Sequence, residues 1–377
     1  DDYLVRGMEI PRRSVDEYEG ASDELRALYD AFAAGFNYFL ETHPEVERRV
    51  IQRVEPWHTL ALIRFKYHHN EFLGYAGLRR DHSLRALERA RGDDALDRMA
   101  GPGDPGTSLA WPDGVLEPNG ERALGSNEWA VSGARTASGS PMLLINPHVS
   151  FFGLSTYWEV HLESEEGLSF SGQTRFGFLL PYMGNNGHLG WAYTDNYGDH
   201  GDLYLEELGP DSTTYRYDGE WRDLTTWTET IHVQTSDGLE PREFRFGKTH
   251  HGPILGLTED GRPLAVRLAK LDEGGWFEQW YGMMRASSLE TWRASVALLN
   301  VPYMNTMYAD RDGNILYLYT HAIPRRSPDY DWSRPVPGSD PGTEWQGYHD
   351  LDELPQFLNP ESGYLQNTNS DPFMATE

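Results

Sequence analysis

A five-residue segment, Gly125-Ser126-Asn127-Glu128-Trp129, contains a serine that could act as a nucleophile if the chain were cut in front of it. Cleavage of the Gly125–Ser126 bond would give Ser126 a free α-amine with an ordinary pKa of about 7.7–8.0, so one residue would supply both the nucleophile and its base. A glycine before the serine permits the close approach to the preceding carbonyl that self-cleavage requires. Taken alone, Gly-Ser-Asn is more often a turn or a helix cap.

Several further motifs follow Ser126 along the chain. They are Pro141–His148, Gly190–Asp195, Gly198–Asp202, His251–Pro253, Asn305–Ile315 and Asn359–Asn369. Their composition and order resemble the catalytic chain of the penicillin acylase family of N-terminal nucleophile hydrolases, and a histidine at position 148 resembles the acyl-homoserine lactone and cephalosporin acylase branch. With upstream matches at Tyr29–Asn37 and Glu55–Trp57, the resemblance covers residues 25–373. It implies an acylase that cleaves the amide bond of an N-acyl substrate after autoproteolysis at Gly125–Ser126.

The resemblance implies an α+β fold, in which two stacked antiparallel sheets are covered by helices as an αββα sandwich. It divides the chain into a helical part at residues 1–100, a linker or propeptide at 101–125 that ends at the cleavage site, and the N-terminal portion of the catalytic chain at 126–377, truncated relative to the family. It also implies export to the periplasm or secretion, and two chains from one precursor that stay associated.

The same resemblance implies roles for four residues. Ser126 is the expected nucleophile, and His148 is expected to orient its amine. Acyl transfer develops an oxyanion that needs preorganised donors, and the backbone N–H of Asp195 and the side-chain amide of Asn367 match the family positions that supply them. The family usually has a small or apolar residue at the position of Asp195, so a carboxylate there is a departure that puts the substrate class in doubt.

Substrate and metal positions follow from the same motifs. An apolar acyl pocket is expected from Val149, Phe152, Phe176 and Tyr182, and the expected substrates are N-acyl-homoserine lactones or β-lactams. The chemistry itself needs no cofactor. Asp199, Gly201 and Asp202 offer the hard oxygen ligands of a structural Ca²⁺ site, with Glu71 as a further candidate ligand. The doublets His68-His69 and His250-His251 lack metal-ligand spacing and are interpreted as structural histidines.

Composition excludes several other classes of protein. With 59 acidic and 32 basic residues the formal net charge is −27, which disfavours binding to nucleic acid or to anionic membranes. The absence of cysteine excludes disulfides, zinc–thiolate sites and thiol nucleophiles. No apolar run is long enough to span a membrane as a helix.

Hydrophobic periodicity agrees with the division into a helical and a β-rich part. Ser22 can cap a helix whose apolar residues recur every three to four positions from Leu25 to Leu40, and a second helix is predicted to begin near Thr59. Beyond Ser126, alternation predicts strands at 127–133, 142–146, 156–162, 168–174, 189–194, 228–234 and around 307–319. A helix is predicted at 288–300, and Asp218-Gly219 marks a hairpin turn.

Two alternatives remain open at this point. The 12 Trp and 21 Tyr residues, together with the many carboxylates, also suit a carbohydrate-binding or carbohydrate-hydrolysing protein. A catalytically silent homologue is the other alternative, favoured by the unusual Asp195. The two differ from an acylase in that neither depends on Ser126.

Overall fold

The computed structural model describes residues 2–48, 50–72, 125–149, 156–196, 198–236, 238–258, 260–301 and 303–370. Most of the predicted linker and the predicted pocket residue Phe152 lie outside these residues. The helices are α1 (Asp2–Gly7), α2 (Ile10–Gly20), α3 (Asp23–Thr42), α4 (His58–Arg64), α8 (Trp276–Arg285) and α9 (Leu289–Val296), with a π-helix at Phe65–Phe72. Within the described part, no helix has the length and apolar character needed to cross a membrane.

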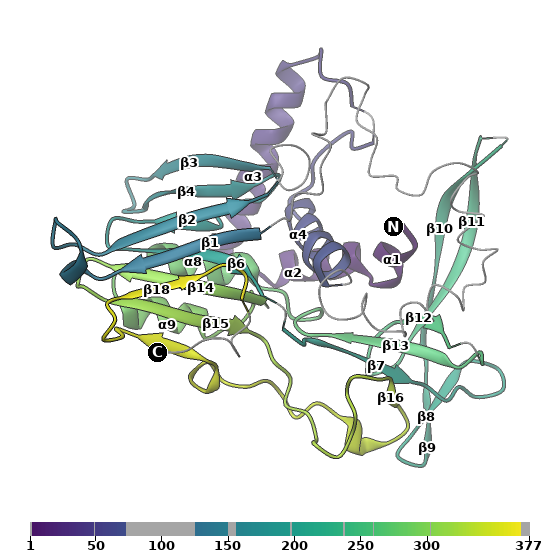
Figure 1. Cartoon of the computed structure of the whole chain (residues 1–377). Coiled ribbons are helices and arrows are strands. Elements are labelled where there is room, and N and C mark those ends of the chain that lie inside the picture. Colours follow the sequence, from purple (N-terminus) through teal and green to yellow (C-terminus); the bar gives the residue numbers. More distant parts are fainter. Residues whose placement is uncertain are drawn as a thin grey trace.

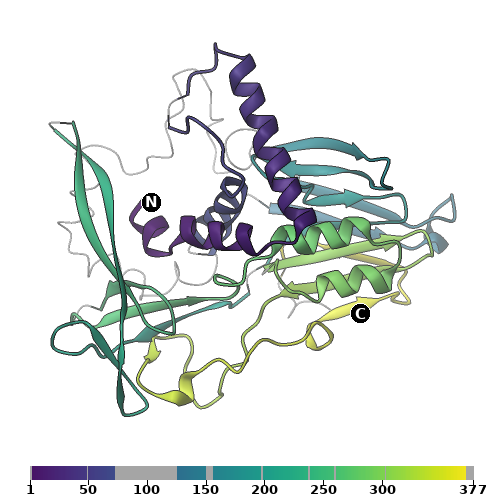
Figure 2. The same ribbon diagram turned by 180° about the vertical axis from the view of Figure 1, so that it is seen from behind.

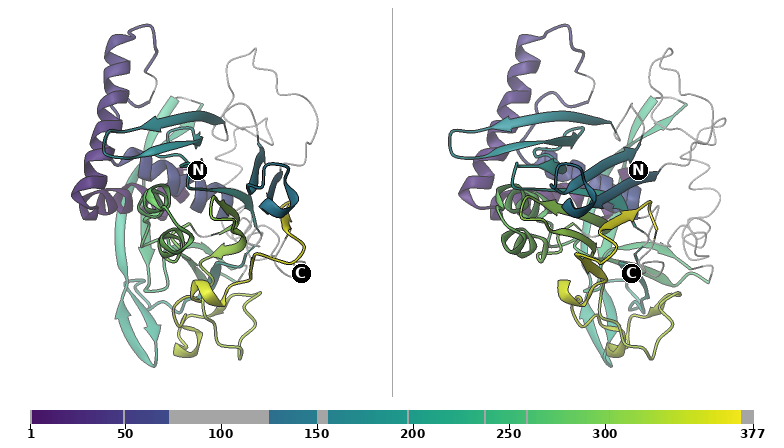
Figure 3. Two further views of the ribbon diagram at one scale, coloured as in Figure 1. Left: turned by 90° about the vertical axis from the view of Figure 1, so that its left-hand side faces the viewer. Right: turned by 60° about the vertical axis from the view of Figure 1, so that its left-hand side comes forward.

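Helices α3 and α4 begin where the sequence predicts. The Ser22 side chain accepts a hydrogen bond from the backbone N–H of Leu25 at 3.3 Å and so caps α3. Leu25 and Tyr29 bury the first half of the apolar stripe, whereas Phe39 is 45% exposed. The reason is visible in the ribbon views, where the far end of α3 projects beyond the sheets (Figures 1, 2 and 3).

Two antiparallel sheets are stacked on the left side of the molecule in Figure 1. The larger has the order β17-β15-β14-β6-β5-β4-β3, and its strands are Gln356–Leu358, Ile315–His321, Tyr303–Asp310, Leu189–Asp195, Met183–Asn185, Ser169–Arg175 and Tyr157–Glu163. The smaller has the order β18-β1-β2, with strands Tyr364–Asn367, Gly125–Val131 and Met142–His148. Strands β1, β2, β3, β4, β6, β14 and β15 agree with the predicted ones to within a few residues, whereas β5, β17 and β18 are not among the predicted strands.

Helices α8 and α9 cover one face of the seven-stranded sheet, as the view from behind shows (Figure 2). Trp280 of α8 donates its indole N–H to the hydroxyl of Tyr193 on β6 at 3.3 Å, and Trp292 of α9 packs on Tyr308 of β14 with ring centroids 4.6 Å apart. Helix α9 and its Ser288 cap confirm the predicted helix at 288–300. Helix α8 is not among the predicted helices.

The three-stranded sheet packs on the opposite face, where Ala130 of β1 lies against Ala192 and Met307. Its own outer face carries exposed apolar side chains, including Trp129, Met142 and Leu144. The described residues therefore form helix, sheet and sheet layers, and the expected second helical layer is not among them. The αββα prediction is confirmed only in its mixed α and β character and its stacked sheets.

A second group of strands lies beside this sandwich (Figure 1). One sheet has the order β12-β13-β7-β16, with strands Ile254–Leu257, Pro263–Leu268, Gly201–Leu205 and Val336–Pro337. Two hairpins extend from it, β8 (Thr214–Tyr217) with β9 (Glu220–Asp223) and β10 (Thr225–Thr235) with β11 (Gly238–Lys248). The first hairpin turns at Asp218 and Gly219, both with positive φ, as the sequence predicts.

Candidate active site

Ser126 lies on the central strand of the three-stranded sheet. Strand alternation places Ser126, Glu128 and Ala130 on the face that packs against the seven-stranded sheet, and all three are buried. Their register partners are Pro147 on β2 for Ser126 and Asn367 on β18 for Glu128. The candidate nucleophile is therefore held on a regular strand, between two sheets, rather than on a surface loop.

Both polar groups of Ser126 have defined partners. The hydroxyl donates to the carbonyl oxygen of Gly125 at 2.7 Å, and the backbone N–H donates to the side-chain oxygen of Asn369 through a short hydrogen bond. The hydroxyl oxygen thus lies beside the peptide group that self-cleavage would attack. A Cβ on Gly125 would lie 3.2 Å from the same Asn369 oxygen, so a side chain at this position would crowd the contact.

Asn369 bridges Ser126 to Asp195. Its side-chain nitrogen donates to the backbone carbonyl of Asp195 at 2.9 Å, while its oxygen faces Ser126. Because a peptide N–H can only donate and a carbonyl oxygen can only accept, these partners fix the orientation of the amide. Asn369 has a φ of 67°, a left-handed conformation that asparagine tolerates better than most residues. The sequence analysis missed this residue, although it is the second asparagine of Gln-Asn-Thr-Asn.

Asn367, the predicted oxyanion donor, lies behind Asn369 as seen from Ser126. Its side-chain nitrogen donates to the carbonyl oxygen of Ser370 at 3.1 Å, and its oxygen accepts from the Thr194 hydroxyl at 2.7 Å and from Asn305 at 3.1 Å. Asn305, on β14, is fully buried and also accepts from the Tyr317 hydroxyl. The structure thus places Asn369, and not Asn367, against the serine, because β18 ends at 367 and the chain then turns toward β1.

Asp195 is at the end of β6, where the sequence analysis expects it. The Asp195 group that contacts Asn369 is its backbone carbonyl oxygen. Residues 193 and 195 share a face of β6, and Tyr193 packs toward α8, so alternation turns the Asp195 carboxylate away from the face that Ser126 occupies. The unusual carboxylate therefore does not point at the nucleophile.

His148 is not brought to the nucleophile. It is opposite Gly125 in the β1–β2 register, and directly opposed residues project to the same face of a sheet, so His148 lies on the face opposite to that of Ser126. Its Nε2 lies 3.2 Å from the side-chain nitrogen of Asn127, and its side chain is exposed. The predicted role in orienting the amine is not supported by this arrangement of the uncut chain.

The predicted pocket residues do not form one lining. Val149 follows directly after β2 and is partly buried, and Phe152 lies outside the described residues. Phe176 is 47% exposed beyond the end of β4. Tyr182 is only 1% exposed and packs 5.0 Å from Tyr193 and 5.3 Å from Trp280, between ring centroids. Tyr182 is therefore a core residue, and the aromatic content that suggested a pocket serves packing there.

The predicted calcium ligands are close together, but an arginine already balances the negative charge of their carboxylates. Arg326 donates to a carboxylate oxygen of Asp202 at 2.7 Å and to one of Asp199 at 3.1 Å, and it also approaches the Asp199 carbonyl oxygen at 3.3 Å. Burial raises the pKa of Asp202 to about 6, and Arg326 offsets part of that effect. The other Asp202 oxygen is buried with no hydrogen-bond partner in the described part of the chain. Gly201 begins β7, and Glu71 lies in the π-helix.

Oxygen donors of this kind suit Ca²⁺ in part. The unpartnered Asp202 oxygen and the Asp199 carbonyl are hard ligands, but two carboxylates and a carbonyl fall short of the six to eight oxygens that Ca²⁺ takes. The fit is therefore partial, and no step of the chemistry depends on it.

Glu128 is an unpredicted feature of the site. Its carboxyl group is fully buried on the same face as Ser126, two residues along β1, and no described side chain donates to either oxygen. Burial raises the pKa of Glu128 well above its usual value, and the backbone N–H of Met307 opposes this only in part. A carboxyl group in such a place favours its neutral form.

The chain is similar to several known proteins. A model of the family described as penicillin amidase matches residues 1–376. Penicillin acylase 2 proenzyme of Pseudomonas sp. strain SE83 is 26% identical over 98% of this chain and 51% of its own length, and acyl-homoserine lactone acylase PvdQ of Pseudomonas fluorescens strain Pf0-1 is 30% identical over 67% and 35%. The chain thus spans about half or less of the curated relatives it matches.

A solved structure is similar as well. The thermostable penicillin G acylase of Alcaligenes faecalis superposes with a TM-score of 0.58 at 26% sequence identity, over 67% of this chain and 45% of that one. The stacked sheets that carry Ser126 are consistent with this similarity. Since the family model covers all but one residue of the sequence, the chain belongs to the penicillin amidase family.

Proposed function

We propose that this chain is part of an acylase that hydrolyses the amide bond of an N-acyl substrate through Ser126, after the bond between Gly125 and Ser126 has been cleaved. The observation that carries the proposal is the placement of the Ser126 hydroxyl 2.7 Å from the Gly125 carbonyl oxygen, while Asn369 holds the Ser126 nitrogen. An acyl shift would start from a hydroxyl that lies beside its own preceding carbonyl group. The nitrogen that Asn369 holds would become the catalytic amine.

In the proposed reaction the Ser126 hydroxyl loses its proton to the new α-amine and attacks the substrate carbonyl carbon. The α-ammonium returns this proton to the substrate nitrogen as the C–N bond breaks and the amine leaves, and water then hydrolyses the acyl-enzyme to release the acid. Asn369 accepts a hydrogen bond from the α-amine, and this contact holds the lone pair of the amine in a fixed direction for the proton transfer. For the oxyanion we retain the Asp195 N–H as one donor, and we propose the amide of Asn369 in place of Asn367 as the other, because Asn369 contacts both Ser126 and Asp195.

The wider assignments are proposals of the same kind. Relatives are named as penicillin acylases and acyl-homoserine lactone acylases, so N-acyl-homoserine lactones and β-lactams are the proposed substrates. A structural Ca²⁺ at Asp199, Gly201 and Asp202 would require Arg326 to move from Asp202 or to share it. Export to the periplasm or beyond the cell, and lasting association of the two cleaved chains, are proposed from the family.

The test compares three proteins by intact mass, N-terminal sequencing and release of free amine. The wild type is expected to give a new terminus reading Ser-Asn-Glu-Trp and to hydrolyse at least one member of a panel of N-acyl-homoserine lactones of different acyl lengths and penicillin G. Ser126→Ala is expected to stay uncut and inactive. Ser138→Ala, in the exposed turn between β1 and β2, serves as the matched control and is expected to behave as the wild type.

Two results would count against the proposal. Amine release by Ser126→Ala at the wild-type rate would show that another residue carries the reaction. A wild-type chain that remains uncut and inactive would favour the catalytically silent homologue.

A further inference from the structure

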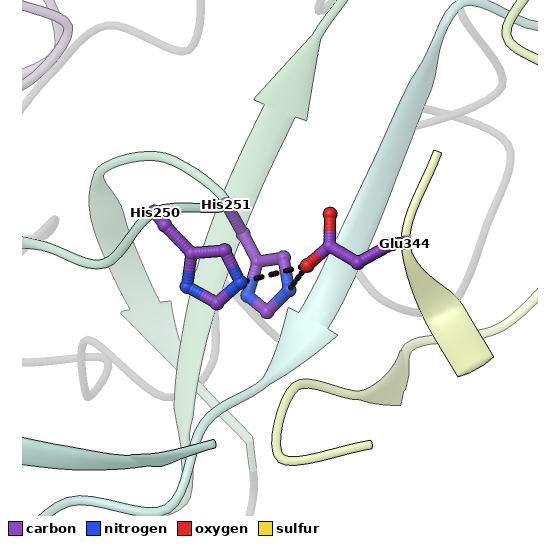
Figure 4. A group of neighbouring side chains, drawn as sticks. All are labelled: His250, His251 and Glu344. Atoms are coloured by element: carbon purple, nitrogen blue, oxygen red, sulfur yellow. Dashed lines mark hydrogen bonds and ion pairs between the residues drawn. The ribbon is translucent and has the colours of Figure 1, made fainter. Parts of the chain in front are cut away.

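Two adjacent histidines face one carboxylate (Figure 4). They lie beside the sheet β12-β13-β7-β16, apart from the two stacked sheets that carry Ser126. His250 and His251 lie in the turn between β11 and β12, and Glu344 follows the short 3-10 helix Pro341–Thr343. The Nε2 atom of His250 lies 2.7 Å, and that of His251 3.1 Å, from the same oxygen of Glu344. Segments almost a hundred residues apart thus bring three ligand-type atoms within 4.8 Å of one another.

The other nitrogen of each ring is held from behind. The Nδ1 atom of His251 is 2.8 Å from a carboxylate oxygen of Glu206, and the Nδ1 atom of His250 is 3.0 Å from the hydroxyl of Tyr215. A metal-binding histidine typically donates its second ring N–H to such a partner, which fixes both the tautomer and the direction of the ring. Here both rings have that partner, and both Nε2 atoms point to the same place.

The His251 ring is also tightly packed. Tyr204 stacks on His251 with ring centroids 3.9 Å apart, and His251 is only 3% exposed. The second oxygen of Glu344 accepts from Arg267 at 3.0 Å, which leaves the first oxygen directed at the histidines. Such side chains have little freedom to lose when a ligand binds.

With one choice of histidine tautomers, the cluster has room for a cation. If His251 donates its Nδ1 hydrogen to the Glu206 carboxylate, and His250 donates its Nδ1 hydrogen to the Tyr215 oxygen, both Nε2 atoms carry lone pairs aimed at the negative oxygen of Glu344. Three acceptors would then converge without a donor. Either extra protons or a metal ion must stand between them, and two imidazole nitrogens with a carboxylate oxygen are the ligand set of Zn²⁺ and its neighbours.

We propose that His250, His251 and Glu344 bind a divalent transition-metal ion of the Zn²⁺ class, with Glu206 and Tyr215 orienting the two rings. The ion joins the β11–β12 turn to the loop that carries Glu344, and its role is structural. It replaces the simpler interpretation of this doublet as ordinary structural histidines. In the other doublet, His68 packs on Trp276 with ring centroids 5.3 Å apart.

The test titrates metal alone into tag-free protein that has been treated with a chelator and then freed of it, near neutral pH. Co²⁺ serves as the visible-absorption probe and Zn²⁺ as the competitor, and calorimetry gives the stoichiometry. We expect one equivalent of metal, displacement of Co²⁺ by Zn²⁺, and a higher Tm of the metal-loaded protein than of the stripped protein, because an ion that binds only the folded chain stabilises it.

His250→Gln and Glu344→Gln are expected to weaken metal binding by at least about tenfold and to lose the metal-dependent rise in Tm. His161→Gln is the matched control, since His161 is an exposed strand histidine near a carboxylate, 3.8 Å from Glu163, and it is expected to bind as the wild type does. Circular dichroism of each stripped variant checks that it is folded. Absence of saturable binding to the wild type, or unchanged affinity in a folded His250→Gln, would overturn the proposal and assign the cluster to protons instead.

Discussion

Glu128 tests whether the face of β1 that carries Ser126 is buried as the structure shows. Its carboxyl group should make stability depend on pH in a way that glutamine at this position would not. Replacing it with glutamine keeps the shape of the side chain and removes its ability to ionise. Both the parent and the Glu128→Gln variant are best made in a Ser126→Ala background, so that each protein stays as one uncut chain. Any difference in stability then reports the carboxyl group and not the extent of cleavage.

The sign of the effect follows from burial. Because burial raises the pKa of Glu128, the folded chain holds a proton on this group in a pH range where the unfolded chain, with an ordinary value of 4.5, has released it. Stability from this group is complete below the unfolded value and is lost as pH rises toward the folded value. The loss is about 1.4 kcal/mol for each unit by which the pKa is raised. Glu128→Gln has no such loss, so its advantage over the parent grows with pH.

Urea unfolding of both proteins from acidic to mildly alkaline pH measures this difference. Taking the difference at each pH cancels the contribution of the other carboxylates, which both proteins share. Glu220→Gln, an exposed glutamate on β9, is the control and is expected to change stability by no more than about 0.5 kcal/mol at any pH. Parallel curves for parent and Glu128→Gln, with no pH-dependent gap, would refute the reasoning.

Three further predictions concern the amide beside the serine, the core and a helix cap. Asn369→Ala removes the partner of the Ser126 nitrogen and is expected to slow turnover of the proposed cleaved enzyme roughly 10- to 100-fold in steady-state kinetics. This factor follows from about 1.5–3 kcal/mol for a hydrogen bond to a charged group. Trp292→Ala empties a fully buried site on α9 and is expected to cost about 3–5 kcal/mol in urea unfolding. Ser22→Ala removes the cap of α3 and is expected to cost about 0.5–2 kcal/mol in the same assay.

The sequence predicts local structure well where one short-range rule decides it. Ser22 caps its helix because its hydroxyl meets an N–H three residues on, and Asp218-Gly219 turns its hairpin because both residues accept positive φ. Strands with one buried face are found from alternation alone. Helix α8 was missed because a Gly-Gly pair precedes it and no side-chain cap marks its start, so the N-terminal signal of a helix is absent from the sequence.

The site is less predictable because it depends on register and on a single turn. The order of the motifs predicts that His148 and Ser126 lie in one site. The β1–β2 register instead places their side chains on opposite faces of the sheet. Asn367 and Asn369 differ by two residues, and only the end of β18 between them decides which one reaches the serine. The sequence gives no signal that Arg326 is a partner of Asp202, since 124 residues separate them.

The polar residues behind Ser126 explain why an amide, and not a histidine, lies beside it. Asn305 on β14, Thr194 on β6 and Asn367 at the end of β18 share hydrogen bonds in the space between the two sheets. Asn367 in turn accepts from the backbone N–H of Asn369 at 2.8 Å, which fixes the residue that contacts Ser126. A buried polar network of this kind holds one arrangement, because breaking any member leaves an unpaired group in the core. The position and direction of the serine nitrogen are thus set by three strands of the folded chain.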